Sequence, residues 1–295
     1  RRHEGSMAPL LMGHPFLNKI ATETWRFQIL VFALFLDATR EPTNPRTGLT
    51  TANLQAICSR AKLASPGRVS AFLNILKLAG YLSSLRCAAD QRVVHLIPTD
   101  KLMEVVEAWT VNIFAVIDTA LPGAALTEAA RRHPELGQAM RVSGAEWLLG
   151  GWDPLGPFPE VRHFADCDGG WLTMEHVIGR NIGADGTLRI APVALNLRET
   201  AKTFGGSRSN LLRLLARGYE LGLLDSPPRG GAEIVFSSRM VCSYLAFIAW
   251  FLGVCHDHAV RGLEWIAPAR AGAQRNKSIL LLSTDLQKSD VEQVA

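Results

Sequence analysis

The chain has 295 residues, of which 48% are hydrophobic and 20% charged, and its formal net charge is +4. This composition excludes an intrinsically disordered protein, and the length predicts two ordinary domains of about 150 residues each. The five cysteines are odd in number and widely spaced, which excludes a disulfide ladder or a Cys-x-x-Cys zinc ribbon and predicts reduced thiols in a cytoplasmic protein.

The amino-terminal part of the chain is predicted to be an arm followed by a buried helix. Residues 1–18 contain Pro9, Gly13 and Pro15 and are expected to form a flexible arm. Residues 25–38 are apolar nearly all round, which is typical of a helix buried on more than one side. Residues 41–48 then form a loop rich in proline and glycine.

Residues 50–80 predict a helix, a turn and a second helix. Thr50 is a helix-starting residue, and apolar residues follow it at a spacing of three and four: Leu54, Ile57, Cys58 and Ala61. Ser65 is expected to cap the second helix with its hydroxyl, since Pro66 suits the first helical position. The buried stripe of this helix is predicted to be Val69, Phe72, Leu73 and Leu76. Gly80 supplies its left-handed end.

After Gly80 the pattern changes to that of a two-stranded hairpin. Residues 81–86 and 92–97 have strand composition, and residues 87–91 form a small, polar tip. Pro98 ends the second strand, and Thr99 is expected to cap a long amphipathic helix. Helix, turn, helix and hairpin in this order predict a winged helix-turn-helix.

The sequence from Leu49 through Asp90-Gln91-Arg92 to Leu102 resembles the MarR family of bacterial transcription regulators. The resemblance implies that the serine-capped second helix enters the DNA major groove and that the Asp-x-Arg wing places its arginine at the minor groove. By position it assigns DNA contacts to Ser65, Arg68, Ser70, Asn74 and Lys77 on the helix and to Asp90 and Arg92 on the wing. A plain surface ion pair between Asp90 and Arg92 is the structural alternative.

Arg86 adds a positive charge to the wing, and residues 54–101 hold seven Lys and Arg against two acidic residues, as phosphate contact requires.

The same pattern returns in the second half of the chain. Two helices are predicted at 124–132 and 135–149, a boundary at 150–159, and a helix at 171–182. Asn196 then caps a helix, residues 205–206 make the turn, and aligning Ser65 with Ser207 places Gly80 on Gly222 without a gap. The second set of DNA contacts is predicted to be Ser207, Arg208, Ser209, Asn210, Arg213 and Arg229, although this wing lacks the Asp-x-Arg order.

The predicted fold class is therefore mainly α with small β-hairpin wings (α+β), with two winged helices arranged as a pseudo-dimer. The predicted division is an arm (1–18), a first winged helix (19–120), a helical linker (121–165), a second winged helix (166–262) and a tail (263–295). The chain is expected to act alone as a pseudo-dimer or as a homodimer. Its apolar run at residues 240–255 is shorter than the roughly 20 residues of a membrane span, so no membrane partner is expected.

The predicted function is a sequence-specific transcription regulator that binds double-stranded DNA at an asymmetric operator. A plasmid-type replication initiator with two winged helices and a winged-helix module that binds proteins remain alternatives.

No nucleophile motif, phosphate-binding glycine loop or cofactor fingerprint is found, so neither an enzyme nor a cofactor is expected. No metal site is predicted, because adjacent residues in Cys255-His256-Asp257-His258 point in different directions on a helix. A pocket for a small aromatic effector is proposed at Trp109, Trp147, Trp152 and Trp171, with core packing as the alternative.

Overall fold

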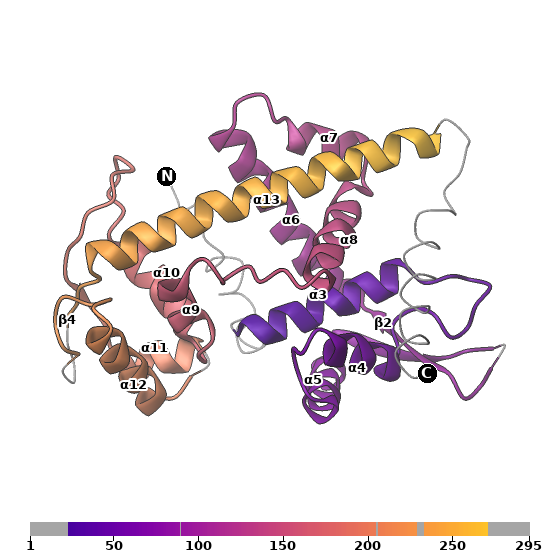
Figure 1. Cartoon of the computed structure of the whole chain (residues 1–295), viewed down its shortest axis with the longest axis horizontal. Helices are drawn as coiled ribbons and strands as arrows, with labels where there is room; N and C mark the ends of the chain where they lie inside the picture. The colour runs from indigo at the N-terminus through magenta and orange to yellow at the C-terminus, as the bar shows by residue number, and fades with distance from the viewer. Residues whose placement is uncertain (1–22, 89, 205, 229–232, 271–295) are drawn as a thin grey trace, which may run out of the picture.

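The structure is a computed structural model that describes residues 23–88, 90–204, 206–228 and 233–270. It is mainly helical and contains two small antiparallel sheets of two strands each, which confirms the predicted α+β class (Figure 1). The predicted arm, Arg229 and residues 271–295 of the predicted tail lie outside the described residues.

From residue 23 onward, the described part of the first half contains four helices and one hairpin. They are α3 (Thr24–Ala38), α4 (Thr51–Arg60), α5 (Pro66–Leu78), β1 (Leu82–Arg86), β2 (Val94–Pro98) and α6 (Asp100–Ala120). β1 and β2 pair in antiparallel register from Leu82 opposite Pro98 to Arg86 opposite Val94. The predicted helices and hairpin of this half are therefore present, with ends that differ by one or two residues.

The second half has helices at corresponding places after three connecting helices, but its predicted hairpin is reduced, among the described residues, to a single antiparallel bridge between Leu224 and Phe236. The connecting helices are α7 (Leu126–Arg132), α8 (Leu136–Leu149) and α9 (Pro159–Ala165). They are followed by α10 (Gly170–Arg180), β3 (Val193–Ala194), α11 (Leu197–Phe204), α12 (Arg208–Glu220), β4 (Glu233–Ile234) and α13 (Ser238–Arg270). The sequence predicted neither α9 nor β3, and α13 continues past the predicted domain end at residue 262.

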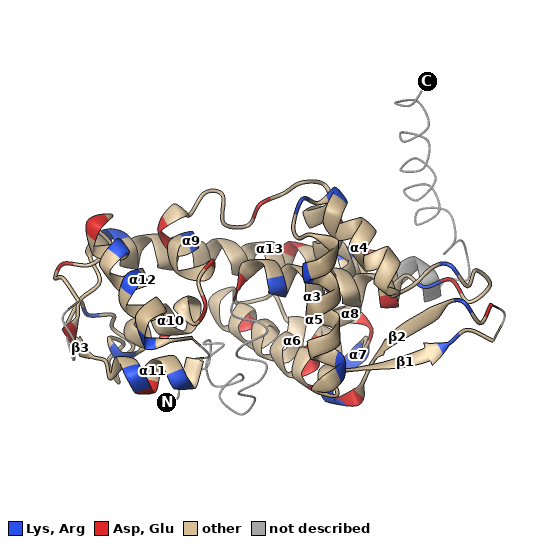
Figure 2. Ribbon diagram, turned by 90° about the horizontal axis from the view of Figure 1, so that it is seen from below, with Lys and Arg blue, Asp and Glu red and all other residues tan. Residues whose placement is uncertain are grey.

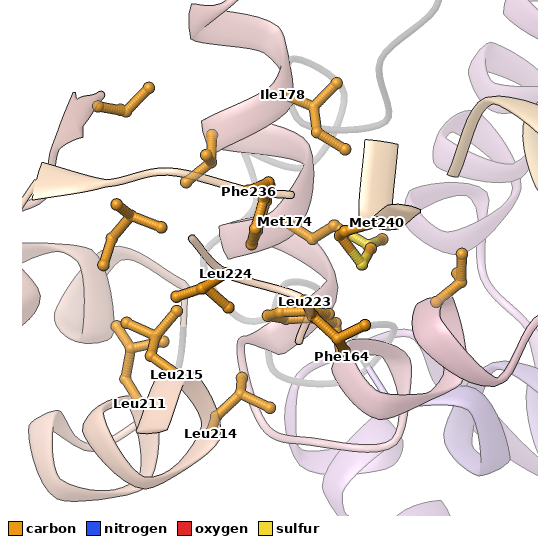
Figure 3. Packing of buried hydrophobic residues seen from close by; sticks show 14 of the residues in the cluster. Phe164, Met174, Ile178, Leu211, Leu214, Leu215, Leu223, Leu224, Phe236 and Met240 are labelled. Carbon is orange, nitrogen blue, oxygen red and sulfur yellow. The ribbon is translucent and has the colours of Figure 1, made fainter. Parts of the chain in front are cut away.

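Three groups of buried residues hold the elements together. The first joins α3, α4, α5 and the hairpin to the start of α6, and the second joins α9 to α12 with the start of α13. Figure 3 shows the second group, in which Phe164 of α9 and Phe236 meet leucines of α12. The third group lies between the end of α6, α7, α8 and the end of α13. Because α9 packs into the second core, this core begins earlier in the chain than the predicted boundary at residue 166.

The two halves share one hydrogen-bonded arrangement behind the second helix of each. Gly80 and Gly222 both have left-handed backbone, with φ of +76° and +71°. The Thr99 hydroxyl donates to the carbonyl oxygen of Gly80 at 2.8 Å, and the Ser237 hydroxyl donates to that of Gly222 at 2.8 Å. Each hydroxyl therefore ties the residue just before a long helix to the end of the preceding helix.

The strand pairings repeat as well. The Leu96 N–H of β2 donates to the carbonyl oxygen of Leu49 at 2.8 Å, so the residue before α4 lies against the hairpin. In the second half Val193 of β3 pairs with Ile234 of β4 at the equivalent place, just before α11. The internal repeat inferred from sequence thus extends to the backbone hydrogen bonds.

Two of the predicted helix caps differ from expectation. Ser65 and Thr99 occupy the cap positions of α5 and α6, but neither side chain makes a capping hydrogen bond. The Thr99 hydroxyl is instead engaged by Gly80. Thr50 and Ser207 do cap α4 and α12, accepting from Asn53 and Asn210 respectively at 3.1 Å.

Candidate nucleic-acid interface

Helix α5 exposes the face opposite its buried stripe, but not every predicted contact residue lies on that face. Ser65, Arg68 and Asn74 are exposed, whereas Ser70 and Lys77 are half-buried. The Ser70 hydroxyl accepts a hydrogen bond from the Gln55 side chain at 2.9 Å, which joins α5 to α4. Ser70 therefore serves the packing of the two helices in this structure.

The first wing presents an exposed arginine at its tip. The Arg92 N–H donates to a carboxylate oxygen of Asp90 at 3.0 Å, so Asp90 fixes the backbone of the turn. Among the described residues the two side chains form no ion pair, and the contact between them is this structural hydrogen bond of the turn. Arg86 is also exposed, at the end of β1. Both arginines can reach a phosphate or a groove.

Helix α12 carries a more basic exposed face. Ser207, Arg208, Ser209, Asn210 and Arg213 are all exposed, as their proposed role requires. The Arg213 guanidinium donates to the Asn210 side chain, and Arg217 pairs with Glu220 at 2.7 Å. Figure 2 shows Lys and Arg residues along α11 and α12. Sequence reasoning did not include Arg217, although it lies one helical turn after Arg213.

Matching α5 with α12 shows where the two faces differ. With Ser65 on Ser207, the outward positions Ala71, Ile75 and Leu78 of α5 correspond to Arg213, Arg217 and Glu220 of α12. Ile75 and Leu78 are 42% and 89% exposed, and Ala71 is exposed as well. The predicted contact residues did not include these three apolar residues, although the helical period placed Ala71 on the face opposite the buried stripe.

Both helices lie on the same side of the molecule. In Figure 1, α5 and α12 extend below the long helix α13, one from each half of the chain. Their buried stripes face separate cores, so each exposed face points away from its own core. One ligand that runs along this side could contact both helices.

The four tryptophans proposed for an effector site lie in two kinds of surroundings. Trp109 and Trp152 line an apolar cavity of about 190 Å³ between α3, α6, α8 and α13. Trp147 stacks on Trp152 at 4.3 Å between ring centroids but does not line this cavity, and Trp171 packs against Phe247 in the second core.

Two polar groups on the cavity wall are buried. The Trp109 indole nitrogen has no hydrogen-bond partner among the described residues. The Arg141 guanidinium donates to the Thr110 hydroxyl at 3.0 Å, and burial lowers the pKa of Arg141 to about 10. The cavity is thus lined mainly by apolar side chains, and the Trp109 indole N–H and the Arg141 guanidinium lie at its wall.

No protein family, no curated protein and no solved structure matches the chain. In the part of the chain that the structure describes, no group of three His, Cys, Asp or Glu side chains could hold a metal ion. Residues 238–266 of α13 are long and apolar enough to cross a membrane by length and composition, a test that core helices of soluble proteins also pass. The functional argument therefore depends on the internal repeat and on the two exposed helices.

Proposed function

We propose that the chain is a tandem winged helix-turn-helix protein that acts as a sequence-specific, DNA-binding transcription regulator. The observation that carries the proposal is the repeated unit itself. Each half has a helix that ends at a left-handed glycine, and the carbonyl oxygen of that glycine accepts a hydrogen bond from the hydroxyl of the residue before the next long helix. The two helices lie on the same side of α13 (Figure 1).

The two units would act as a pseudo-dimer on one duplex. Recognition helices of a dimer enter successive major grooves about 34 Å apart, one turn of DNA. In a homodimer the two helices are identical and the operator is palindromic, whereas here α5 and α12 carry different residues. The operator is therefore expected to be asymmetric.

Selection of bound sequences from random duplex DNA tests this proposal, followed by affinity measurements at two salt concentrations. Arg213→Ala should weaken binding about 10- to 100-fold and relax one half-site, because an arginine that reads guanine is lost. Arg92→Ala should weaken all sequences similarly and reduce the salt dependence by about one ion, because a wing arginine contacts phosphate.

Arg131→Ala is the matched control, because Arg131 is an exposed arginine of α7, far from both reading helices in sequence. It should leave binding unchanged. Failure to enrich any sequence, with binding lost at moderate salt, would contradict the proposal. Enrichment of iterated copies of one site would favour a replication initiator.

A second candidate is a winged-helix module that binds another protein. The exposed apolar residues Ile75 and Leu78 favour it, because apolar side chains on a helix face often mark a protein contact. In that case Ile75→Ala would leave DNA affinity unchanged for every sequence.

We also propose that the cavity at Trp109 and Trp152 binds a small aromatic effector. Its volume of about 190 Å³ exceeds that of an engineered cavity of about 150 Å³ known to bind benzene. Benzoate is a suitable probe, and it should change the affinity for the selected DNA. Val254→Trp should fill the cavity and abolish this response while DNA binding without benzoate persists. An equal response in both proteins would contradict the effector site.

A further inference from the structure

We infer that the two reading helices recognise different base chemistry: α5 reads thymine methyl groups through Ala71 and Ile75, whereas α12 reads guanine through Arg213 and Arg217. This inference rests on the proposed DNA-binding function. It assigns an A·T-rich half-site to the first unit and a guanine-containing half-site to the second.

The outward face of α5 is apolar at its centre. Ala71 and Ile75 lie one turn apart on the face opposite the buried stripe, and both are exposed. Asn74 lies beside them and is exposed too. In the major groove only thymine offers a methyl group, and Asn pairs with the adjacent edge of adenine. Alanine, isoleucine and asparagine together therefore suit a run of A·T pairs.

Exposed Lys and Arg residues lie before α5, in its first turn and beyond its other end. Arg60 and Lys62 are exposed just before α5, and Arg68 is exposed in its first turn. Lys101 is exposed beyond the other end of α5, where its ammonium donates to the Ala79 carbonyl oxygen. A purely apolar protein partner would leave these cations unmatched. A polyanion that also exposes methyl groups could pair with these cations and pack on the apolar residues of α5. The DNA major groove, with its phosphates and thymine methyl groups, has that chemistry.

The outward face of α12 has the opposite character. Arg213 and Arg217 replace Ala71 and Ile75 at the same positions of the repeat, one turn apart. Each guanidinium is already oriented by a neighbour on its own helix, Asn210 for Arg213 and Glu220 for Arg217. An arginine presents a planar fork that pairs with O6 and N7 of guanine. This face therefore suits guanine.

The experiment replaces single groups in the selected operator. Uracil in place of thymine removes only the methyl group, and 7-deazaguanine in place of guanine removes the N7 acceptor. Uracil in one half-site should weaken binding about three- to fivefold per contacted methyl. 7-Deazaguanine in the other half-site should weaken binding about tenfold, because one hydrogen bond of a bidentate pair is lost.

Protein variants assign each effect to a helix. Ile75→Ala should reduce the response to uracil, leaving only the part due to Ala71, and should not change the response to 7-deazaguanine. Arg213→Ala should reduce the response to 7-deazaguanine, leaving only the part due to Arg217, and should not change the response to uracil. Val111→Ala is the matched control, because Val111 is an apolar residue of α6 that is 56% exposed and lies outside both reading helices and the wing. It should change neither response.

Three outcomes would overturn the inference. Wild-type affinity could be insensitive to uracil in both half-sites, or Ile75→Ala could retain the full response to uracil. Both would leave the DNA-binding function standing. Failure to select any operator would overturn the inference together with the proposed function.

Discussion

Helices α5 and α12 have the same surroundings on the inside and different chemistry on the outside. Both follow a helix and a tight turn, both end at a left-handed glycine, and both bury residues at the same positions of the repeat. Their outward positions are apolar in α5 and charged in α12. The inward residues and the turn glycines thus specify the fold, and the outward residues are free to specify the partner.

The largest effect is expected from a matched pair of core truncations, one in α5 and one in α12. Leu73 of α5 and Leu215 of α12 occupy the same position of the repeat and are 1% and 0% exposed. Leu73→Ala and Leu215→Ala should each lower the free energy of unfolding by about 2–5 kcal/mol, because each leaves a cavity. Denaturant titration followed by circular dichroism measures both. A loss below about 1 kcal/mol in only one variant would show that the two cores are not equivalent.

The contact between the start of α3 and Asp168 of the second half should make the stability of the protein depend on pH. Glu23 precedes α3, and Arg26 of α3 pairs with both Glu23 at 3.4 Å and Asp168 of the second half at 3.3 Å. Burial, together with a hydrogen bond to Asp168, raises the pKa of Glu23 to about 7, while Arg26 opposes this shift. The folded state therefore holds a proton on Glu23 at pH values where the unfolded state has released it.

Stability should accordingly fall as the pH rises from about 4.5 to about 7, because the folded state binds more protons than the unfolded state in that window. The loss attributable to Glu23 is at most about 3 kcal/mol. Denaturant titrations at several pH values measure it, and Glu23→Gln should remove this part of the pH dependence. Glu104→Gln, an exposed change on α6, is the control. An unchanged pH profile in Glu23→Gln would rule out this role.

The smallest effect on stability is expected from substitutions at the helix caps. The Ser207 hydroxyl accepts from the Asn210 N–H at 3.1 Å, whereas Ser65 makes no capping hydrogen bond. Ser207→Ala should therefore cost about 1 kcal/mol, and Ser65→Ala only a few tenths. Thermal unfolding of the two variants compares them directly. Equal losses would mean that Ser65 also caps its helix in solution.

The sequence predicted those parts of the fold that depend on local chemistry. Gly80 and Gly222 were predicted as helix ends because left-handed backbone favours glycine, and both have positive φ. Strand β3 could not be predicted, because its two residues are held by pairing with β4, forty residues later in the chain. Helix α9 was missed for a similar reason, since Phe164 is buried by contacts with distant residues such as Phe236.

The candidate interface was predicted only in part. Periodicity identified the exposed face of α12. The family resemblance placed Ser70 among the contact residues of α5, where the Gln55 side chain donates a hydrogen bond to it. The choice of polar residues also left out Ala71 and Ile75, which the structure places on the exposed face of α5. The buried stripe of a helix determines which of its residues point outward. Polarity alone does not identify all of these outward residues.

Helix α13 connects the core that contains α12 to the group of buried residues that contains the end of α6. Its 33 residues span about 50 Å, and its ends belong to different cores, one shared with α12 and the other shared with α6. A continuous helix cannot stretch as a flexible linker can. The separation of the two half-sites should therefore be fixed, and inserting one base pair, which adds about 3.4 Å and rotates one half-site by roughly a tenth of a turn, should not be absorbed by the protein.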